Sequence, residues 1–485
     1  MIGSAAVPYS DRVAALHPFA PATPRSTAEI EAVEQLDRAR LWKPFTQMSD
    51  YPGSRPLVIE EGRGNWLRDI RGDVFLDGVS SLWVNVHGHA HPCIVKAVQE
   101  QIARLDHSTL LGPTNVPAAR LAGRLVDAAP RFDGQPELAR VFYSDSGSTS
   151  VEIAVKMAFQ YWAQHEDPAG RARNVFVSMT NAYHGDTLGS VSVGGIELFH
   201  ELYRPLLFET RRAPAPDPYH RAFGGDVAEH EGWCLDRLRD LFDECDGRVA
   251  ALVMEPLVQG AAGMLMHSTD FLRAAAALAR ERGALLILDE VATGFGRTGT
   301  MFASEQAGVV PDLLCVAKGL TGGVLPLAAT LATEEVYSGF LGRYEDFRTF
   351  FHGHSFTGNP PACAAALASM DVFDEERVLE RVQARAQQLG GRLAELDGHP
   401  HVGDVRRCGL MTGIELVADP ASGEAYPSAL QVGNRVIERA RDHGVLIRPL
   451  GSVVVLMPPL SITEAELDLL CDVVFASIDD VTSAL

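Results

Sequence analysis

The feature that most constrains the fold is a series of apolar segments between about Arg140 and Thr333. These segments alternate with stretches of helical spacing, one of which, Phe271–Arg282, is closed by Gly283. Buried strands that alternate with helices are typical of a mostly parallel sheet with helices on both faces. The sequence therefore predicts an α/β fold whose ligand chemistry gathers at the carboxyl ends of the strands. The predicted strands are Asn174–Met179, Val249–Met254, Ala284–Leu288, Leu313–Val316 and Leu327–Leu331.

The chain on either side of this region has a different pattern. Leu57–Leu76 alternates apolar and polar residues around glycines, which predicts short hairpins. After Asn359 the chain is rich in helical spacing and ends in an α+β section, which predicts a smaller second domain. We therefore expect an N-terminal segment (1–76) that contributes to the small domain and the active site, a large domain (77–345) and a C-terminal small domain (346–485).

Charge and cysteine usage exclude several classes of protein. The formal net charge of −21 at pH 7 repels phosphate backbones and anionic lipid surfaces. The apolar runs are too short to span a bilayer, and the first residues lack the pattern of a signal peptide. The seven cysteines include no C-x-x-C pair, so neither a disulfide framework nor a cysteine zinc site is indicated. We expect a cytoplasmic protein with no nucleic-acid or membrane partner.

Two charged residues follow neighbouring predicted strands. Asp289 ends the strand that begins at Ala284, and Lys318 comes shortly after Leu313–Val316. Taken singly, Asp289 would be an acid that caps a turn, and Lys318 would be a solvated lysine at the end of a strand. Because both are expected at one sheet edge, the pair suits pyridoxal phosphate: the lysine amine forms an imine with the cofactor, and the aspartate keeps the pyridine nitrogen protonated. The lysine amine also serves as a general acid–base.

Two further segments supply the remaining parts of such a site. Ser144–Ser150 leads into a helix, where free backbone amides form an anion site, and Thr149 and Glu152 fit a capping box there. Tyr183 follows another strand and offers an aromatic face to a planar cofactor. An ordinary capped helix and a surface tyrosine are the alternatives for these segments taken singly. Together with the lysine and the aspartate, they complete the requirements of one cofactor.

Two other motifs carry less weight. Gly294–Gly299 matches G-x-G-x-x-G, but Asp289–Thr293 separate it from the preceding strand, so a nucleotide-binding oxidoreductase is a minor alternative. The histidines of His87–His91 and His352–His354 have no accompanying helical metal motif. We expect them to be loop histidines near a pocket and predict no metal site.

The stretch from about Leu41 to Pro459 resembles the class III, or ω-type, aminotransferases of fold type I. The resemblance is carried by Asp289–Gly299 and Cys315–Gly323. It implies a mostly parallel sheet with flanking helices, a smaller α+β domain and pyridoxal 5'-phosphate as cofactor.

The resemblance also assigns roles to single residues. Lys318 would form the imine with the cofactor, Asp289 would pair with the pyridine nitrogen, and Tyr183 would cover the ring and touch substrate. The cofactor phosphate would be bound by residues of two segments, the second reaching across a homodimer from the partner subunit. The first segment contains Gly147 and Ser148, and the second contains Gly353, His354 and Ser355.

A further set of segments resembles one branch of this family, which transfers an amino group to 8-amino-7-oxononanoate and so makes 7,8-diaminononanoate in biotin biosynthesis. The segments are Leu41–Met48, Ser80–Trp83, His87–His89, Ile447–Pro449 and Leu456–Pro459. The resemblance implies that Arg448 holds the carboxylate of the keto acid, for which a rigid fork of donors is suited. A surface ion pair is the alternative for Arg448. The substrate pocket would also include Phe45, Leu82, Trp83, Tyr183, Lys318 and Gly353.

Three positions depart from the members that use S-adenosylmethionine. Those members carry a tryptophan where Leu82 stands and tyrosines where Phe45 and Val455 stand. Losing these aromatics changes how a cationic sulfonium would be held. The segments Ser81–His89 and His352–Ser355 resemble a branch that uses lysine as the donor, so S-adenosylmethionine and lysine both stay open. A broad ω-amino acid–pyruvate transaminase is the alternative function. A non-catalytic pyridoxal-phosphate regulator would need a DNA-binding domain, which this acidic chain does not supply.

Overall fold

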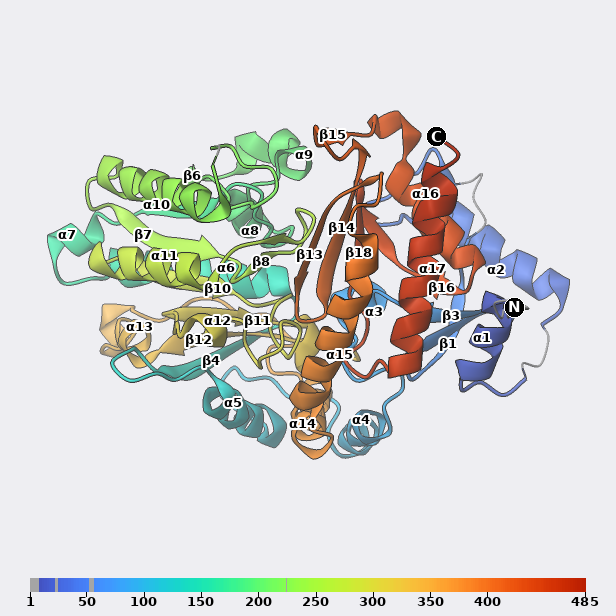
Figure 1. The fold of residues 1–485 in the computed structure, drawn as a ribbon. Coiled ribbons are helices and arrows are strands. Elements are labelled where there is room, and N and C mark those ends of the chain that lie inside the picture. Colours follow the sequence, from blue (N-terminus) through green and yellow to red (C-terminus); the bar gives the residue numbers. More distant parts are fainter. Residues whose placement is uncertain (1–7, 22–24, 52–55, 224) are drawn as a thin grey trace.

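The computed structural model describes residues 8–21, 25–51, 56–223 and 225–485. A large α/β part lies on one side of the molecule, and a smaller part that carries both ends of the chain lies on the other (Figure 1). Within these residues, no helix combines the length and the apolar character needed to cross a membrane.

The large part is built on a seven-stranded sheet with the order β4-β12-β11-β10-β7-β5-β6. Its strands are β4 (Leu138–Ser144), β5 (Val175–Met179), β6 (Thr210–Ala213), β7 (Val249–Met254), β10 (Leu285–Asp289), β11 (Leu313–Val316) and β12 (Ala328–Thr333). The five strands from β11 to β6 run parallel, whereas β12 is antiparallel to both of its neighbours. Residues 317–327 contain no crossover helix, and without one a strand can return only in the opposite direction. The predicted mostly parallel sheet is confirmed.

Alternating side chains of the strands divide the core into two layers. On β10, Leu285 and Ile287 pack in the layer that contains α6, while Leu286 and Leu288 pack in the layer that contains α11. The first layer holds α6 (Gly147–Ala163), α8 (Leu188–Val193) and α13 (Glu334–Ser338). The second layer holds α5 (Val116–Ala128), α10 (Val227–Glu244) and α11 (Thr269–Glu281). Both faces are therefore covered, as the apolar runs predict.

The small part contains an antiparallel sheet of the order β13-β14-β18-β17. These strands are β13 (Val402–Cys408), β14 (Met411–Asp419), β18 (Val453–Leu456) and β17 (Arg448–Leu450), with β15 (Glu424–Ala425) on β14. The helices of this part are α15 (Val378–Leu393), α16 (Val432–Asp442) and α17 (Glu464–Thr482), and α16 packs on β17 and β18. This is the predicted α+β section.

The N-terminal segment joins the small part through a third sheet. The predicted hairpins are confirmed as β1 (Ile59–Arg63), β2 (Trp66–Asp69) and β3 (Val74–Asp77), which pair antiparallel. Strand β3 also pairs in parallel with β16 (Val445–Leu446).

The other elements are α1 (Tyr9–Leu16), α2 (Thr27–Arg40), α3 (Ser80–Trp83), α4 (Pro92–Arg104), α7 (Pro168–Arg171), α9 (Glu197–His200), β8 (Val258–Gln259), β9 (Leu265–Met266), α12 (Ser304–Ala307) and α14 (Pro360–Glu375).

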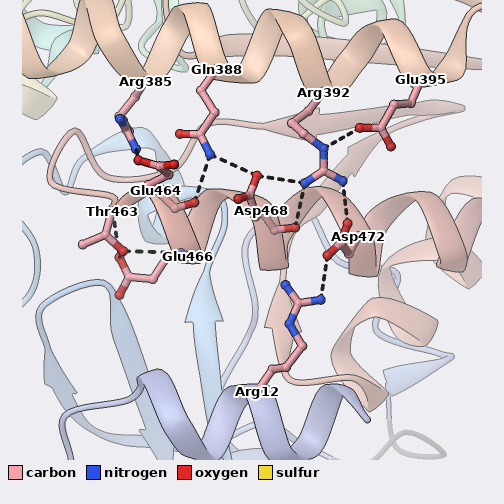
Figure 2. Close-up of polar contacts among 10 residues, drawn as sticks. All are labelled: Arg12, Arg385, Gln388, Arg392, Glu395, Thr463, Glu464, Glu466, Asp468 and Asp472. Atoms are coloured by element: carbon pink, nitrogen blue, oxygen red, sulfur yellow. Dashed lines mark hydrogen bonds and ion pairs between the residues drawn. The ribbon is translucent and has the colours of Figure 1, made fainter. Parts of the chain in front are cut away.

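A network of ionic contacts ties α1 to the small part (Figure 2). Arg392 of α15 donates to Asp468 at 2.9 Å and to Asp472 at 2.5 Å, both on α17. Asp472 also accepts from Arg12 of α1 at 2.6 Å. Burial acts to raise the pKa of Asp472, but the hydrogen bonds from Arg12 and Arg392 outweigh it and hold the pKa below its usual value.

Candidate active site

A cavity of about 680 Å³ opens at the carboxyl ends of β10 and β11. Because the two strands are parallel neighbours, with Asp289 opposite Cys315, the residues that follow them reach the same edge of the sheet. Six of the predicted site residues line this cavity, namely Trp83, Gly147, Ser148, Tyr183, Asp289 and Lys318. The structure thus brings the lysine, the aspartate, the helix N-terminus and the tyrosine together.

Lys318 reaches the cavity from a tight turn after β11. Its own φ is 41°, in the left-handed region, and its Nζ lies 4.8 Å from the centre of the Trp83 ring. Burial lowers the pKa of Lys318 to about 8, although the charges of Asp289 and Glu255 act to raise it. About a tenth of this amine is therefore neutral at pH 7, far more than in a solvated lysine, and the neutral form is the one that attacks a carbonyl.

Asp289 is held in place by two hydrogen bonds. Its Oδ2 lies 2.8 Å from Nδ1 of His184, and its Oδ1 accepts from the backbone amide of Val291 at 3.0 Å. Both His184 and Asp289 are buried. Burial disfavours protonation of His184, but the hydrogen bond to Asp289 outweighs it and raises the pKa of the imidazole. The pair therefore places an oriented carboxylate in the cavity.

Glu255 adds a third ionisable group at this edge. It follows β7, the other parallel neighbour of β10, and accepts from the backbone amides of Tyr183 at 3.1 Å and Gly260 at 2.9 Å. Burial, assisted by the charge of Asp289, raises the pKa of Glu255 to about 7, while His184 acts to lower it. Three adjacent strands thus end in Glu255, Asp289 and Lys318.

The start of α6 forms the anion-binding side of the cavity. Ser146 caps this helix by accepting from the backbone amide of Thr149, whose side chain completes the capping box. The predicted box of Thr149 and Glu152 is wrong, because the helix begins at Gly147, nearer the chain start than that box requires. The side chain of Glu152 accepts instead from the Thr187 hydroxyl and the Gly189 amide, at 2.7 and 2.8 Å.

The loop that carries Tyr183 packs tightly on α6. Ser148 Oγ accepts from the Thr187 amide at 2.9 Å. Gly185 has a φ of +113°, and a Cβ there would lie 2.3 Å from Ser148 Oγ, so only glycine permits this approach. The Tyr183 hydroxyl donates to Asp186 at 2.8 Å. These contacts hold the tyrosine ring at the cavity wall.

A second cavity, of about 770 Å³, adjoins the first and shares Trp83, Tyr183 and Lys318 with it. Six predicted substrate residues line the second cavity, namely these three shared residues and Phe45, Leu82 and Arg448. Arg448 makes no ion pair with any residue that the structure describes. Lys318 therefore lies where the cavity at the sheet edge meets a second cavity that extends to an arginine of the small part.

Comparison with known proteins identifies the family. The model of the family "Aminotransferase class-III" matches residues 49–478. This chain is a class-III aminotransferase.

Relatives of this aminotransferase share most of its length. A curated protein of Nitratidesulfovibrio vulgaris, named adenosylmethionine-8-amino-7-oxononanoate aminotransferase, is 54% identical over 95% of this chain and 84% of its own. The solved structure of the protein of that name from Methanocaldococcus jannaschii is 42% identical, with a TM-score of 0.86 over 93% of this chain and 99% of its own. An amine transaminase from an uncultivated Pseudomonas species, solved in a form with bound pyridoxal phosphate, is 34% identical, with a TM-score of 0.86 over 91% of this chain and 98% of its own. The predicted family, fold type and class of enzyme are confirmed.

Three predicted residues of the aminotransferase line neither cavity of the single chain. They are Gly353, His354 and Ser355, all exposed. The His354 amide donates to Thr357 at 3.1 Å. The expectation that this segment completes the partner subunit's site stays a prediction.

The glycine motif at Gly294–Gly299 has a packing role in this aminotransferase. Its Arg297 is buried and donates to the carbonyl oxygens of Asn85 at 2.8 Å and Pro458 at 2.7 Å. Burial lowers the pKa of Arg297 to about 9, although Asp77 acts to raise it. The arginine thus joins the glycine motif to the segment after α3 and to the segment after β18.

The loop histidines of the aminotransferase have separate partners. His87 bonds to Ser369, His89 to Asp77 and His91 to Glu376, at 3.0, 2.8 and 3.0 Å respectively. In the described parts of the chain, no group of three or more histidine, cysteine or acidic side chains could hold a metal ion.

Sequence reasoning assigned no role to two residues of this site. Glu255 directly follows a predicted strand, as Asp289 does, and this common position could have identified it. His184 stands next to Tyr183 in the chain, but its bond to Asp289 depends on how the loop folds back over the sheet edge.

Proposed function

We propose that the first cavity binds pyridoxal phosphate. Four features there suit the cofactor: an amine of lowered pKa at Lys318, an oriented carboxylate at Asp289, free amides at the start of α6, and the ring of Tyr183. In addition, Nε2 of His184 and Nε1 of Trp83 are buried without a hydrogen-bond partner in the described residues, and both side chains line the cavity. When bound, the cofactor supplies an electron sink for cleavage of the bond to the substrate's α-hydrogen.

The protein's own groups then have distinct tasks. Lys318 would hold the cofactor covalently, and its amine, when free, would accept the proton that leaves the substrate's α-carbon. Asp289, oriented by His184, would hold a proton at the ring nitrogen. Gly147 and Ser148 would bind the phosphate through the helix N-terminus, and Tyr183 would cover the ring.

We further propose that the enzyme transfers an amino group to 8-amino-7-oxononanoate. The observation that carries this proposal is the second cavity, which begins at Lys318 and reaches Arg448, an arginine with no ion pair among the described residues. Arg448 would hold the terminal carboxylate, and the side chains of Phe45 and Leu82 would contact the aliphatic chain. The names of the relatives support this acceptor.

The decisive experiment measures transfer to this keto acid by the purified holoenzyme, with S-adenosylmethionine and lysine compared as donors. Formation of 7,8-diaminononanoate with either donor supports the proposal, and its absence with both contradicts it. Leu82 and Phe45 line the second cavity, whereas Val455 lines neither cavity, and the comparison also identifies the donor.

A broad transaminase for ω-amino acids and pyruvate is the second candidate. The likeness to the amine transaminase of the Pseudomonas species supports it. Turnover of β-alanine with pyruvate that exceeds turnover of the biotin precursor would favour this alternative.

We propose that the enzyme works as a homodimer with shared active sites. Exposed aromatic residues surround the segment 353–355, with Phe351 at 73% and Phe356 at 61% exposure, which is typical of a surface that another protein covers. Ser355→Glu would place a negative charge beside the phosphate of the partner subunit's site. In a hybrid dimer of this variant with Lys318→Ala, one of the two sites has both Lys318 and Ser355 intact, so mixing the variants should restore activity. A monomeric mass, or a failure to restore activity, would contradict shared sites.

A further inference from the structure

The sheet of the small part presents one face to the second cavity. Arg406 stands opposite Gly413, Gly413 opposite Val455, and Val455 opposite Arg448. Directly paired residues of antiparallel strands project to the same face, so the two arginines lie on one row across the sheet. Both arginines line the cavity, together with Glu415, two positions from Gly413 on the same strand.

The two arginines of this row differ in their contacts. Arg448 has no ion pair in the described residues, whereas Arg406 donates to Asp404 at 2.8 Å and Glu415 at 2.6 Å. Arg406 also donates twice to the carbonyl oxygen of Gly263, at 2.9 and 2.7 Å. Gly263 lies between β8 and β9, which belong to the large part. Arg406 therefore joins the sheet of the small part to the large part.

A residue of the large part, His220, also binds Glu415. His220 bonds to Glu415 through Nε2 at 2.9 Å and to Asp217 through Nδ1 at 3.1 Å. The two acidic partners raise the pKa of His220 to about 10, so the imidazole is a cation at neutral pH. Asp217 in turn accepts from the amides of Tyr219 and His220, which fixes this loop.

The sheet and the large part are in direct contact beside this cluster. A Cβ on Gly413 would lie 3.0 Å from the carbonyl oxygen of Gly263 and 3.2 Å from Met264. The two surfaces are closely packed at Gly413. If the ionic contacts change, the position of the row of residues that ends in Arg448 should therefore change as well.

We propose that His220 and Arg406, by binding Glu415 from two sides, are positioning residues that fix the distance between Lys318 and Arg448. This distance sets the length of the carboxylate-bearing acceptor. The proposal rests on the proposed function, in which Arg448 binds the carboxylate of the acceptor. Neither residue touches the reacting atoms, so their removal affects binding of the acceptor and selection by length more than the chemical step.

The test compares the holoenzyme with His220→Gln, which removes the charge but keeps hydrogen-bonding groups. His399→Gln is the matched control, because His399 bonds to Asp479 at 2.9 Å and lines neither cavity. The kcat and KM are measured for 8-amino-7-oxononanoate and for homologues one methylene shorter and longer. The donor half-reaction is measured with an amine that has no carboxylate.

For His220→Gln we expect KM for the keto acid to rise roughly two- to fivefold, the range of a partly exposed ion pair. Preference for the natural chain length should fall by a similar factor, while the donor half-reaction and the control stay unchanged. Glu415→Gln should have a larger effect, and the double variant should be no worse than Glu415→Gln, because both residues act through one carboxylate. Unchanged KM and length preference in His220→Gln would overturn the proposal, as would an equal loss with every substrate.

A measurement that needs no turnover separates this proposal from the proposed function. If the wild type accepts none of the keto acids, the proposed function fails. Hydrogen exchange of the holoenzyme then tests whether the contacts of His220 and Arg406 with Glu415 hold the small part against the large part. We expect faster exchange at residues 217–222 and 260–265 in His220→Gln than in His399→Gln. Equal exchange in the two variants would overturn the positioning role of His220.

Discussion

The two cavities that meet at Lys318 are built in different ways. The walls of the first come mainly from the large part, where adjacent parallel strands deliver Glu255, Asp289 and Lys318 to one edge. The second lies between the large part and an antiparallel sheet that contributes Arg406, Glu415 and Arg448. Chain topology alone sets the first arrangement, whereas the second depends on how two parts of the molecule are held together. Cofactor chemistry and acceptor selection therefore have separate structural origins.

The largest expected effect comes from removing the amine that serves both cavities. Lys318→Ala should reduce turnover by at least about 10⁴-fold, because covalent attachment and proton transfer both need that amine. Steady-state assays measure this, with Lys96→Ala on the exposed surface of α4 as control. Near-normal turnover in Lys318→Ala would contradict the assignment.

The next effect is confined to the first cavity. Asp289→Asn should lower kcat by about 10²–10³-fold, because a neutral amide no longer holds a proton at the ring nitrogen. The KM for the keto acid should change little, since Arg448 is untouched. A kcat within tenfold of the wild type would show that the ring nitrogen does not depend on this carboxylate.

A substitution in the second cavity should change KM for the keto acid rather than kcat. Arg448→Ala should raise KM for the keto acid about 10- to 100-fold with a small change in kcat, because the charged hydrogen bonds to the carboxylate persist throughout the reaction. Arg407→Ala is the control, since Arg407 is exposed on the strand that carries Arg406. An unchanged KM would remove Arg448 from the acceptor site.

The lowered pKa of Lys318 predicts a pH dependence for cofactor uptake. Only the neutral amine reacts with the cofactor aldehyde, and burial brings the pKa down to about 8. The rate at which apoprotein takes up pyridoxal phosphate should therefore rise with pH through a midpoint near pH 8 and then level off. Stopped-flow absorbance measures this rate. A rate that continues to rise toward pH 10 would indicate an ordinary solvated lysine.

The smallest effect should come from the outer side of the small part, remote from both cavities. Arg12→Ala removes the ion pair with Asp472, whose two side chains are 28% and 31% exposed. We expect a loss of about 0.5–1 kcal/mol in the free energy of unfolding, seen as a lower denaturation midpoint, with kcat and KM unchanged. A change in KM for the keto acid would show that this network also positions Arg448.

The contrast between the cavities also explains what the sequence could predict. Asp289 and Lys318 come at the ends of fully apolar strands that alternate with helices, and this pattern places both residues at one edge. The capping box at α6 was misplaced because Thr149 and Glu152 fit the usual sequence pattern, a hydroxyl residue followed three positions later by Glu or Gln, whereas the box that forms has a threonine at its second position, Ser146 with Thr149. Which set forms depends on the packing of Glu152 against the Thr187 loop.

The second cavity was harder to predict because it depends on strand register. Arg406 and Glu415 are close in the chain, on the hairpin that β13 and β14 form, but His220 is distant from both and meets Glu415 only through the fold. No local pattern predicts that contact. Arg448 was found through resemblance of its flanking residues to a family, and without that resemblance a surface ion pair was the expected role.

The central claim is that one amine, that of Lys318, joins the cofactor cavity to the substrate cavity. Borohydride reduction of the purified holoenzyme, followed by peptide mapping by mass spectrometry, tests it directly. We predict a pyridoxyl group on the peptide that contains Lys318 and on no other lysine. A stoichiometric adduct on a different lysine, or none at all on a protein that contains the cofactor, would contradict the claim.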